Sequence, residues 1–383
     1  MHGNQVYRVE VGATKPSRAY FGRLLPHGGA TLSPAHDALV DYVSTYGKGR
    51  SNMARKLRVL KASDLNGTLD MRDVLVLIEQ AFAERGLGRT EMPPKSYLHF
   101  PSHQGVLLIM PGNLPQMDEA AVKLISVHTR NPVEHSLPTL IATIVLISPD
   151  TGEPLCIMDG AYITGMRTGA VSGVATKFLA RKDARVLGIV GAGFQGPFQL
   201  EAVRHSMQVE TLLVTDLVPE RARKLGDIAV GFGLKARACE TVEEVVRGCD
   251  VLVTATPSDQ PIVRDEWVHE GMHINCVGTY AAGKQEIEGA ILKRAVVVVD
   301  DWEQASHAGE INVPVSRGEF DRSDVYAELP EIAAGLKPGR TDDAAITVFD
   351  TTGLAVQDVV TAWKAFEVAE LRNLGFLIEP LYT

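Results

Sequence analysis

The chain has 383 residues, about two and a half times a typical domain of roughly 150 residues, so two domains are expected. Hydrophobic residues make up 45% of the chain and charged residues 22%, a globular balance that excludes disorder, collagen and coiled coil. The net charge of −9 and the lack of a long Lys/Arg run argue against nucleic acid and anionic membranes as partners.

The N-terminal segment and the cysteines indicate a reduced, cytoplasmic protein. MHGNQVYRVEVGATK lacks the apolar core of a signal peptide. The longest apolar run, residues 140–147, is far shorter than the ~20 residues that span a bilayer. No metal-ligand spacing relates the four cysteines, Cys156, Cys239, Cys249 and Cys276. Their apolar or small neighbours favour buried free thiols over disulfides.

Residues 1–55 differ from the rest of the chain and are interpreted as an N-terminal arm or extension. From Leu57 a strand is expected, followed by an amphipathic helix over MRDVLVLIEQAFAERG. Four β-rich segments come next and predict a small antiparallel or mixed sheet: KSYLHF, VLLIMPG, AAVKLISVHT and LIATIVLISP. The helix TGMRTGAVSGVATKFLA is rich in small residues, which permits the close approach of another backbone.

Short apolar strands alternate with helices from Ala184 onwards, beginning with RVLGIV and ending with AVVVVDD. This alternation predicts a doubly wound parallel sheet of the Rossmann type over residues 181–345. The tail, ITVFDTTG and a long helix, does not continue the repeat and is expected to return to the first domain. The predicted fold is therefore α/β, with the Rossmann domain inserted in a discontinuous α+β domain of residues 56–180 plus 346–383.

A glycine-rich turn follows the RVLGIV strand directly and predicts a dinucleotide site. It consists of Gly191, Ala192, Gly193, Phe194, Gln195 and Gly196. The first glycine permits a tight turn, the second lets a pyrophosphate approach, and the third lets the helix pack on the strand. The helix N-terminus offers free N–H groups to phosphate. Asp216 ends the next strand, where it would accept ribose hydroxyls and favour NAD; Arg221 nearby could meet a 2′-phosphate, so NADP is the alternative.

Several blocks together resemble the ornithine cyclodeaminase/μ-crystallin family: MPPKSYLHFP, AVKLISVHTRNP, MRTGAVSGVATKFLAR, GAGFQ, GKQEI, DDWEQASHAGEINV and FDTTGLAVQD. The resemblance runs from about Leu57 to the C-terminus, and GKQEI and HAGEINVPVSRG are most similar to the alanine dehydrogenase branch found in archaea. It implies a homodimer in which the discontinuous domain provides both the substrate pocket and the dimer interface.

The resemblance also implies three cationic site residues. The family's catalytic lysine falls on Lys123, which lies inside an apolar strand where a charge is costly unless it is used or its pKa is lowered. Lys95 stands where the family usually has an arginine that binds the substrate carboxylate; lysine keeps the charge but loses the bidentate fork. Arg167 matches the arginine between cofactor and substrate. The alternatives are a strand-edge lysine, a solvated loop lysine and a surface arginine.

Further positions match cofactor contacts of the family, and the resemblance alone assigns them: Thr139, Thr168, Thr256, Val277, Gly278, Lys284 and Thr351. One position departs from the family. Cyclodeaminases and the alanine dehydrogenases most like this chain carry an aspartate two residues beyond the Gly278 position, where it binds the substrate amine. Tyr280 stands there, and a phenol carries no negative charge for a cationic amine at neutral pH. This weakens the case for a diamino acid such as ornithine.

His307 and Glu310 have the spacing of a zinc pair, but no second pair exists, so no metal is expected.

The leading hypothesis is an NAD(P)-dependent oxidoreductase of small 2-amino or 2-imino acids, of the alanine dehydrogenase type, acting on an amino, imino or keto acid. Lys95, Lys123 and Arg167 would hold the carboxylate, and Tyr280 is added to the catalytic candidates. Two rivals stay open: a cyclodeaminase that releases ammonia with bound NAD, and a non-catalytic NAD(P)H-binding protein similar to the crystallins.

Overall fold

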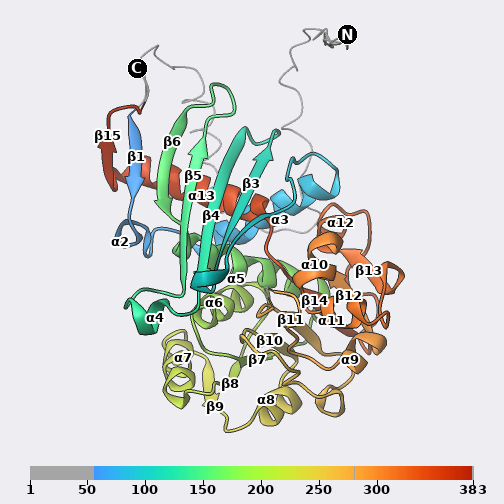
Figure 1. Ribbon diagram of the computed structural model, residues 1–383. Coiled ribbons are helices and arrows are strands. Elements are labelled where there is room, and N and C mark those ends of the chain that lie inside the picture. The colour runs from blue at the N-terminus through green and yellow to red at the C-terminus, as the bar shows by residue number, and fades with distance from the viewer. Residues whose placement is uncertain (1–55, 280, 382–383) are drawn as a thin grey trace, which may run out of the picture. The chain divides into compact units, whose positions relative to one another are not determined.

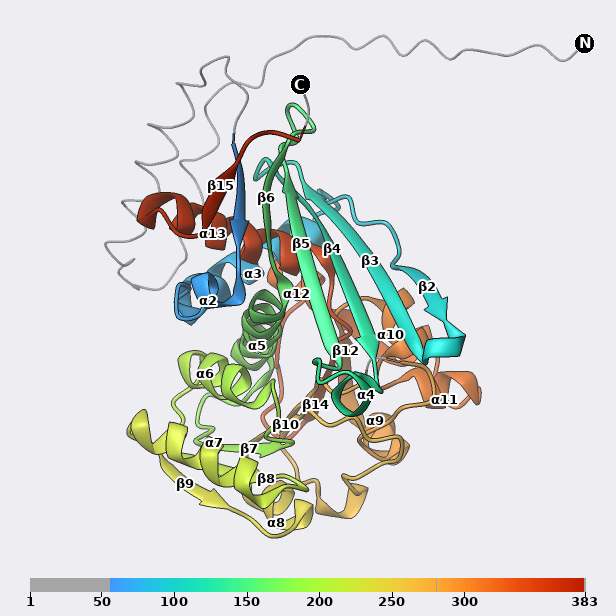
Figure 2. The ribbon, with the colours of Figure 1, turned by 60° about the vertical axis from the view of Figure 1, so that its left-hand side comes forward.

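The computed structural model describes residues 56–279 and 281–381, which contain two β-sheets (Figures 1 and 2). The N-terminal arm expected over residues 1–55 lies outside the described residues. The chain passes from the first sheet to the second through the long helix α5 (Gly160–Leu179). It returns after strand β14 (Ile346–Asp350) through the helix α13 (Ala355–Arg372).

The first sheet has seven strands in the order β15-β1-β6-β5-β4-β3-β2 within the described residues. The strands are β1 (Leu57–Leu60), β2 (Ser96–Phe100), β3 (Gly105–Leu114), β4 (Glu119–His128), β5 (Leu140–Ile147), β6 (Pro154–Asp159) and β15 (Phe376–Ile378). Only β1 and β6 pair in parallel, so the sheet is mixed, one of the two forms expected. Two short helices follow strands of this sheet, α2 (Ala62–Leu65) and α4 (Asn131–Glu134), whereas α12 (Leu329–Ala333) follows a strand of the second sheet and packs against the helix of residues 71–86.

Helix α13 covers β3, β4 and β5 on one face of this sheet, and α3 (Met71–Gly86) packs against α13 (Figure 2). Asp70 caps α3 by accepting a hydrogen bond from the backbone N–H of Arg72. Met71, Val74 and Ile78 recur at helical spacing and are completely buried. The amphipathic helix expected from the sequence is therefore confirmed, because its apolar face packs against the core.

The second sheet has eight strands, all parallel, in the order β13-β12-β14-β11-β10-β7-β8-β9 within the described residues. The strands besides β14 are β7 (Val186–Val190), β8 (Thr211–Thr215), β9 (Lys235–Ala238), β10 (Val251–Thr254), β11 (His273–Cys276), β12 (Ala295–Val299) and β13 (Val325–Glu328). The helices between them are α6 (Gly196–Ser206), α7 (Pro219–Gly231), α8 (Val242–Gly248), α9 (Gly289–Arg294), α10 (Trp302–Ala308) and α11 (Asn312–Ser316). Alternating parallel strands and helices make this the predicted doubly wound sheet.

Strand β14 corrects the boundary drawn at residue 346, which assigned this strand to the first domain. β14 lies between β11 and β12 and pairs in parallel with both. All five of its residues are buried, because a central strand of such a sheet is covered on both faces. The crossing back to the first sheet therefore lies in residues 351–354, and only α13 and β15 return.

Small residues bring α5 and α6 into close contact, as the sequence predicted. A Cβ added at Gly169 would lie 2.5 Å from the Phe198 carbonyl oxygen, and one at Gly173 would lie 3.1 Å from that of Ala202. Larger side chains would separate the two helices. The cysteines are buried and free, as expected. Within the described residues, no helix combines the length and apolar character needed to cross a membrane.

Candidate functional site

Lys123 lies in the middle of β4 on the face covered by α13. Its strand neighbours are Met110 on β3 and Ile144 on β5, both apolar and buried. The lysine is 1% exposed, and its Nζ lies 2.6 Å from Oδ2 of Asp358 on α13. Buried ammonium groups need such a partner, because burial without one is strongly unfavourable. Lys123 is thus an interior residue rather than a strand-edge lysine.

Arg167 on α5 meets the same carboxylate from a second side. Its Nε donates to Oδ1 of Asp358 at 3.1 Å, and its Nη1 donates to Oε1 of Gln357 at 3.0 Å. Arg167 is 7% exposed and Asp358 is 1% exposed. One carboxylate on α13 therefore holds two cations that come from β4 and α5, far apart in the chain.

Lys95 approaches from the segment before β2. Its Nζ donates to the carbonyl oxygen of Thr352 at 2.8 Å, in the turn between β14 and α13. The positions expected to hold a carboxylate, Lys95, Lys123 and Arg167, thus gather around one turn and the start of one helix. Each comes from a different element, so only the folded chain brings them together.

Burial and repulsion by neighbouring cations weaken the charged forms of both lysines. Burial lowers the pKa of Lys123 to about 7, although the anion of Asp358 opposes the change. Burial likewise lowers the pKa of Lys95 to about 8, with Asp300 as the main opposing charge. Arg167 adds to the lowering of both pKa values. Both groups consequently titrate in the range where a general acid or base works well.

Sequence reasoning did not single out Asp358, although FDTTGLAVQD ends on it. A signal was available in the pattern. The first eight residues of α13 are all buried, and three of them, Gln357, Asp358 and Thr361, are polar. Buried polar residues inside an apolar helix face need partners, so these residues pointed to a polar site.

The glycine turn after β7 has the shape that a dinucleotide requires. Gly191 has a φ of +97°, and a Cβ there would lie 2.6 Å from the Ala255 carbonyl oxygen. A Cβ added at Gly193 would meet no described atom within 4 Å. A Cβ at Gly196 would press on Leu225 at 3.0 Å. The turn therefore leaves open backbone at its second glycine, in front of the N-terminus of α6, where a pyrophosphate fits.

Asp216 follows β8 beside this turn. Its Oδ2 accepts the N–H of Ala192 at 2.8 Å, and its Oδ1 accepts the N–H of Val218 at 2.8 Å. Arg221 Nη1 stands 4.0 Å from Oδ1. The carboxylate thus fixes the glycine turn relative to the loop after β8. Next to the turn, Phe194 is 57% exposed and contacts Phe198, and Gln195 precedes the first residue of α6.

The loops after β10 and β11 are joined by the buried carboxylate of Glu286. Its Oε1 accepts the N–H and the hydroxyl of Thr256, both at 2.7 Å. Its Oε2 accepts the hydroxyl of Thr254 at 2.9 Å and the N–H of Gly278 at 2.9 Å. The candidate positions Thr256 and Gly278 are therefore fixed relative to each other, while the Thr256 hydroxyl is engaged by protein. The sequence offered no sign of this link.

Some of the remaining candidates lie near the ends of strands of the second sheet, and others lie outside that sheet. Thr351 directly follows β14, and its hydroxyl donates to Asp300 at 3.0 Å. Thr168 is buried next to Arg167, and its carbonyl accepts from Gln199 on α6. Lys284 donates to Asp259 at 2.7 Å, and Thr139 is exposed just before β5. Val277 follows β11 directly. Tyr280 lies outside the described residues.

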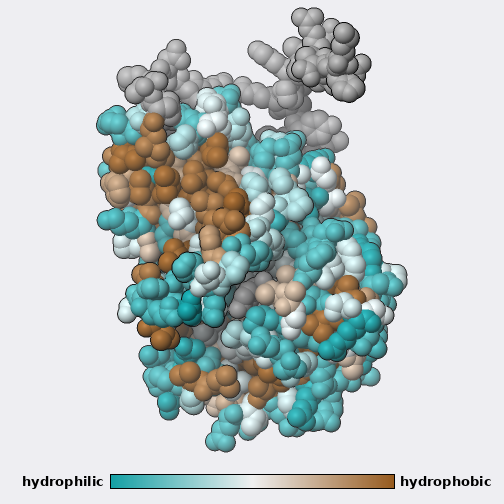
Figure 3. All heavy atoms as spheres, viewed as in Figure 1, coloured by the Kyte–Doolittle hydropathy of each residue, from teal (hydrophilic) through white to brown (hydrophobic). Residues whose placement is uncertain are grey.

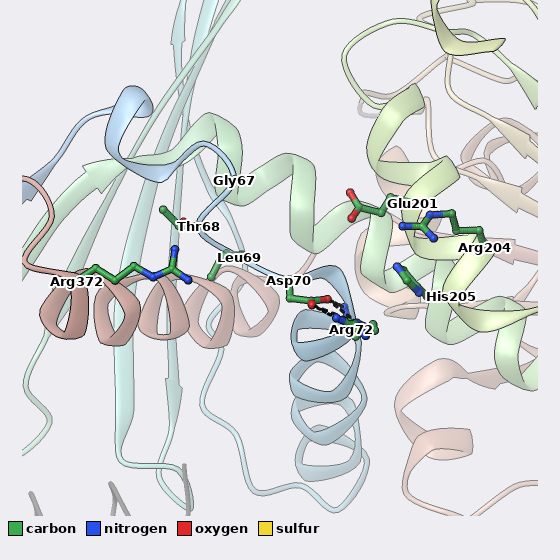
Figure 4. A pocket seen from close by; sticks show the side chains of 9 residues that line it. All are labelled: Gly67, Thr68, Leu69, Asp70, Arg72, Glu201, Arg204, His205 and Arg372. Atoms are coloured by element: carbon green, nitrogen blue, oxygen red, sulfur yellow. Dashed lines mark hydrogen bonds and ion pairs between the residues drawn. The ribbon is translucent and has the colours of Figure 1, made fainter. Parts of the chain in front are cut away.

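A separate groove of about 580 Å³ lies between α3, α6 and the end of α13 (Figure 4). Its lining includes positively and negatively charged side chains, among them Arg372, Glu201 and the pair formed by Asp70 and Arg72. None of the candidate site residues lines it.

His307 contacts the Glu303 carbonyl at the surface, whereas Glu310 is buried and accepts the N–H groups of Glu286 and Ile287, so the two face different partners.

Comparison with known proteins gives one family. The family model described as Ornithine cyclodeaminase/mu-crystallin family matches residues 55–373. An alanine dehydrogenase of Archaeoglobus fulgidus is 44% identical over 321 residues, 84% of this chain and 98% of that protein. The solved structure of an archaeal alanine dehydrogenase dimer with bound NAD has a TM-score of 0.81 at 44% identity, covering 85% of this chain and 99% of its own. The Thermococcus litoralis Delta(1)-pyrroline-2-carboxylate reductase with NADH and L-proline also has a TM-score of 0.81, at 37% identity, covering 84% of this chain and 100% of its own.

Proposed function

Because the chain belongs to the ornithine cyclodeaminase/mu-crystallin family, we propose that it is an NAD-dependent oxidoreductase of small 2-amino or 2-imino acids. Alanine dehydrogenase-type chemistry is the first specific candidate. The observation that carries this proposal is the shared carboxylate of Asp358, which holds Lys123 and Arg167 in one buried cluster. Such a cluster suits a small anionic substrate whose amine or imine must exchange protons.

The three cations divide the work on the substrate in this proposal. Lys95 and Arg167 bind the carboxylate, which fixes the α-carbon of the substrate in one orientation. Lys123 also contacts the carboxylate and, through water, gives or takes the proton as the imine is formed or hydrated. Its pKa of about 7 supports this role, because both protonation states are then present at neutral pH. Asp358 keeps the two buried cations together.

The cofactor in this proposal is NAD, with the pyrophosphate at Gly193 and the N-terminus of α6. When bound, nicotinamide supplies a hydride acceptor or donor for the substrate α-carbon. Arg167 precedes Thr168, whose carbonyl accepts from Gln199 on α6, so the residue next to Arg167 contacts the helix that would hold the phosphates. The Asp216 carboxylate favours NAD over NADP, because it would repel a 2′-phosphate.

We also propose that the chain works as a homodimer through the uncovered face of the seven-stranded sheet. On β4 and β5 the residues pointing away from α13 include Val122 and Val145, which pair across the strands, and Leu124, which pairs with Thr143. Apolar residues gather on the surface over these strands in Figure 3. Isolated soluble proteins seldom expose such a face. In this proposal the first sheet supplies the substrate pocket and dimer interface, and the second sheet binds the dinucleotide.

A substrate panel tests the proposed function. The purified protein is assayed in the oxidative direction with small 2-amino acids and NAD⁺ or NADP⁺, and in the reductive direction with 2-keto acids, ammonia and NADH or NADPH. The expected result is oxidation of L-alanine with NAD⁺ preferred over NADP⁺, or reductive amination of pyruvate with ammonia and NADH preferred over NADPH. Ornithine consumed to proline and ammonia at constant NADH would instead identify a cyclodeaminase. Binding of NADH without turnover across the panel would identify a non-catalytic dinucleotide-binding protein.

A further inference from the structure

Asp300 is a fully buried carboxylate that follows β12 and accepts four hydrogen bonds from one turn. Its Oδ2 accepts the N–H of Thr352 at 2.7 Å, the N–H of Gly353 at 2.8 Å and the hydroxyl of Thr351 at 3.0 Å. Its Oδ1 accepts the hydroxyl of Thr352 at 3.0 Å. All four donors belong to the turn between β14 and α13, so this carboxylate determines the shape of that turn.

The same turn contacts two of the candidate substrate cations. The carbonyl oxygen of Thr352 accepts from the Lys95 ammonium at 2.8 Å. Gly353 has a φ of +79°, and a Cβ on it would lie 2.5 Å from Arg167 Nη1, so the turn backbone lies directly against the guanidinium. Asp358 then follows within the first turn of α13. The position of Lys95, and the space available to Arg167, thus depend on how this turn is held.

Asp300 also contributes charge, since it is the main group that opposes the loss of the proton from Lys95. The charged groups facing Lys95 are the carboxylates of Asp300 and Asp301 after β12, Asp358 on α13 and the cation of Arg167 on α5. Asp301 is already paired with Arg85, and Asp358 is shared by Lys123 and Arg167. Asp300 has no cation as a direct hydrogen-bond partner among the described residues.

We propose that Asp300 is a positioning residue that sets both the place and the charge of Lys95 through the turn 351–353. This proposal rests on the proposed function, since it assigns Lys95 to the substrate carboxylate. Asp300 does not touch the reacting atoms, and its effect reaches the substrate only through Lys95 and Arg167. It is accordingly expected to act on substrate KM more than on kcat.

Two variants separate charge from position. Asp300→Asn can keep its amide oxygen toward the two backbone N–H groups, while the Thr352 hydroxyl turns to accept from the new amide, so the turn is retained and the charge is lost. Thr352→Val keeps the charge and the side-chain shape but removes one of the four hydrogen bonds. Glu286→Gln is the matched control, since this buried carboxylate also accepts four hydrogen bonds but joins other loops.

Two measurements are made on each variant over pH 6 to 10. The first is the KM for the carboxylate substrate, which rises at high pH as Lys95 loses its proton. The second is competitive acetylation of Lys95, quantified by peptide mass spectrometry with the exposed Lys177 as internal reference. The acetylation midpoint reports the protonation of Lys95 without requiring any turnover.

In Asp300→Asn, both the acetylation midpoint of Lys95 and the rise in KM are expected at lower pH than in the wild type, with kcat within about threefold. Thr352→Val is expected to raise KM about threefold at every pH with an unmoved midpoint, the effect of one hydrogen bond. Glu286→Gln is expected to leave the Lys95 midpoint unmoved.

A folded Asp300→Asn protein with an unchanged Lys95 midpoint would overturn the proposal, as would an equal shift in Glu286→Gln. If Asp300→Asn does not fold, an unchanged KM in Thr352→Val overturns it instead. If the Lys95 acetylation midpoint shifts in Asp300→Asn but the wild type turns over no substrate, only the proposed function is contradicted. The two proposals can therefore fail separately.

Discussion

Asp358 on α13 lies 2.6 Å from Lys123 on β4, and its other oxygen accepts from Arg167 on α5. This one carboxylate joins elements from the beginning, the middle and the end of the described chain. Removing one partner of a buried charge pair costs more than the pair itself contributes, because the other charge stays buried. The cluster is therefore expected to respond strongly to single substitutions.

Lys123→Met is expected to abolish most of the turnover while NADH still binds. Methionine fills the volume of the lysine stem without its charge, and Asp358 remains bonded to Arg167. Loss of a proton-transfer group lowers kcat by roughly 10²- to 10⁴-fold. Stopped-flow turnover and a fluorescence titration with NADH measure the two quantities, with Lys177→Met on the outer surface of α5 as the control. Loss of NADH binding together with turnover would mean that Lys123 is a structural lysine.

The pH profile of the wild type should change near pH 7 in opposite senses for the two directions. Lys123 has a lowered pKa of about 7, so the ammonium is present below that pH and the amine above it. Imine reduction needs the proton donor and should slow as the pH rises above about 7. Amino acid oxidation needs the base and should slow as the pH falls below about 7. Profiles of kcat/KM in both directions measure this.

Asp358→Asn should lower the pH at which kcat/KM changes in each of the two directions. The Asp358 anion raises the pKa of Lys123 against the larger effect of burial, so its removal favours the neutral amine further. Asparagine keeps the size and one acceptor oxygen, which isolates the charge. The same kcat/KM profiles, recorded for the variant, decide the point. A change in kcat/KM that stays near pH 7 in the variant would show that another group is titrating.

Arg167→Lys should raise substrate KM by roughly ten- to a hundredfold, since a hydrogen bond to a charged group is worth about 1.5–3 kcal/mol. The guanidinium bonds Asp358 and Gln357 at once through Nε and Nη1. A single ammonium cannot reproduce this fork and still face a carboxylate. Steady-state kinetics at saturating NADH give the KM. An unchanged KM would place Arg167 outside the carboxylate site.

Gly193→Ala should leave the fold intact and weaken NADH binding by about tenfold or more. The added methyl group meets no described atom within 4 Å, so the protein alone has room for it. A pyrophosphate in that space would clash, and each 1.4 kcal/mol of clash is a tenfold loss in affinity. Gly231→Ala at the end of α7 is the control, because its methyl group also enters open space. Equal NADH dissociation constants for the two variants would contradict the cofactor placement.

Val145→Lys should convert the proposed dimer to a monomer. Val145 lies on β5, opposite Val122 on β4, on the uncovered face of the seven-stranded sheet. A charge in an apolar interface is unfavourable without a partner. Light scattering after gel filtration measures the mass, and Val230→Lys on exposed α7 controls for the added charge. A wild-type monomer, or a variant that stays dimeric, would refute this interface.

The sequence by itself was enough to predict the doubly wound sheet, a first sheet that is antiparallel or mixed, the helix at residues 71–86 and the glycine turn. These features are local: strand and helix periods, and the freedom of Gly191 to adopt a positive φ, are written in consecutive residues. The same reasoning misplaced β14, because an apolar strand of five residues looks alike in either sheet. Only its pairing with β11 and β12 determines where it belongs.

Asp358, Asp300 and Glu286 came only from the tertiary structure. Each is one of 47 acidic residues in the chain, and although the polar residues at the apolar start of α13 pointed to a site near Asp358, no local pattern identified the partners that these carboxylates bind. Their roles arise where α13 packs on β4 and where strand ends of the parallel sheet meet, bringing together residues far apart in sequence. Local sequence determined which residue types were present, whereas packing decided which of them touch, because contact depends on the whole path of the chain.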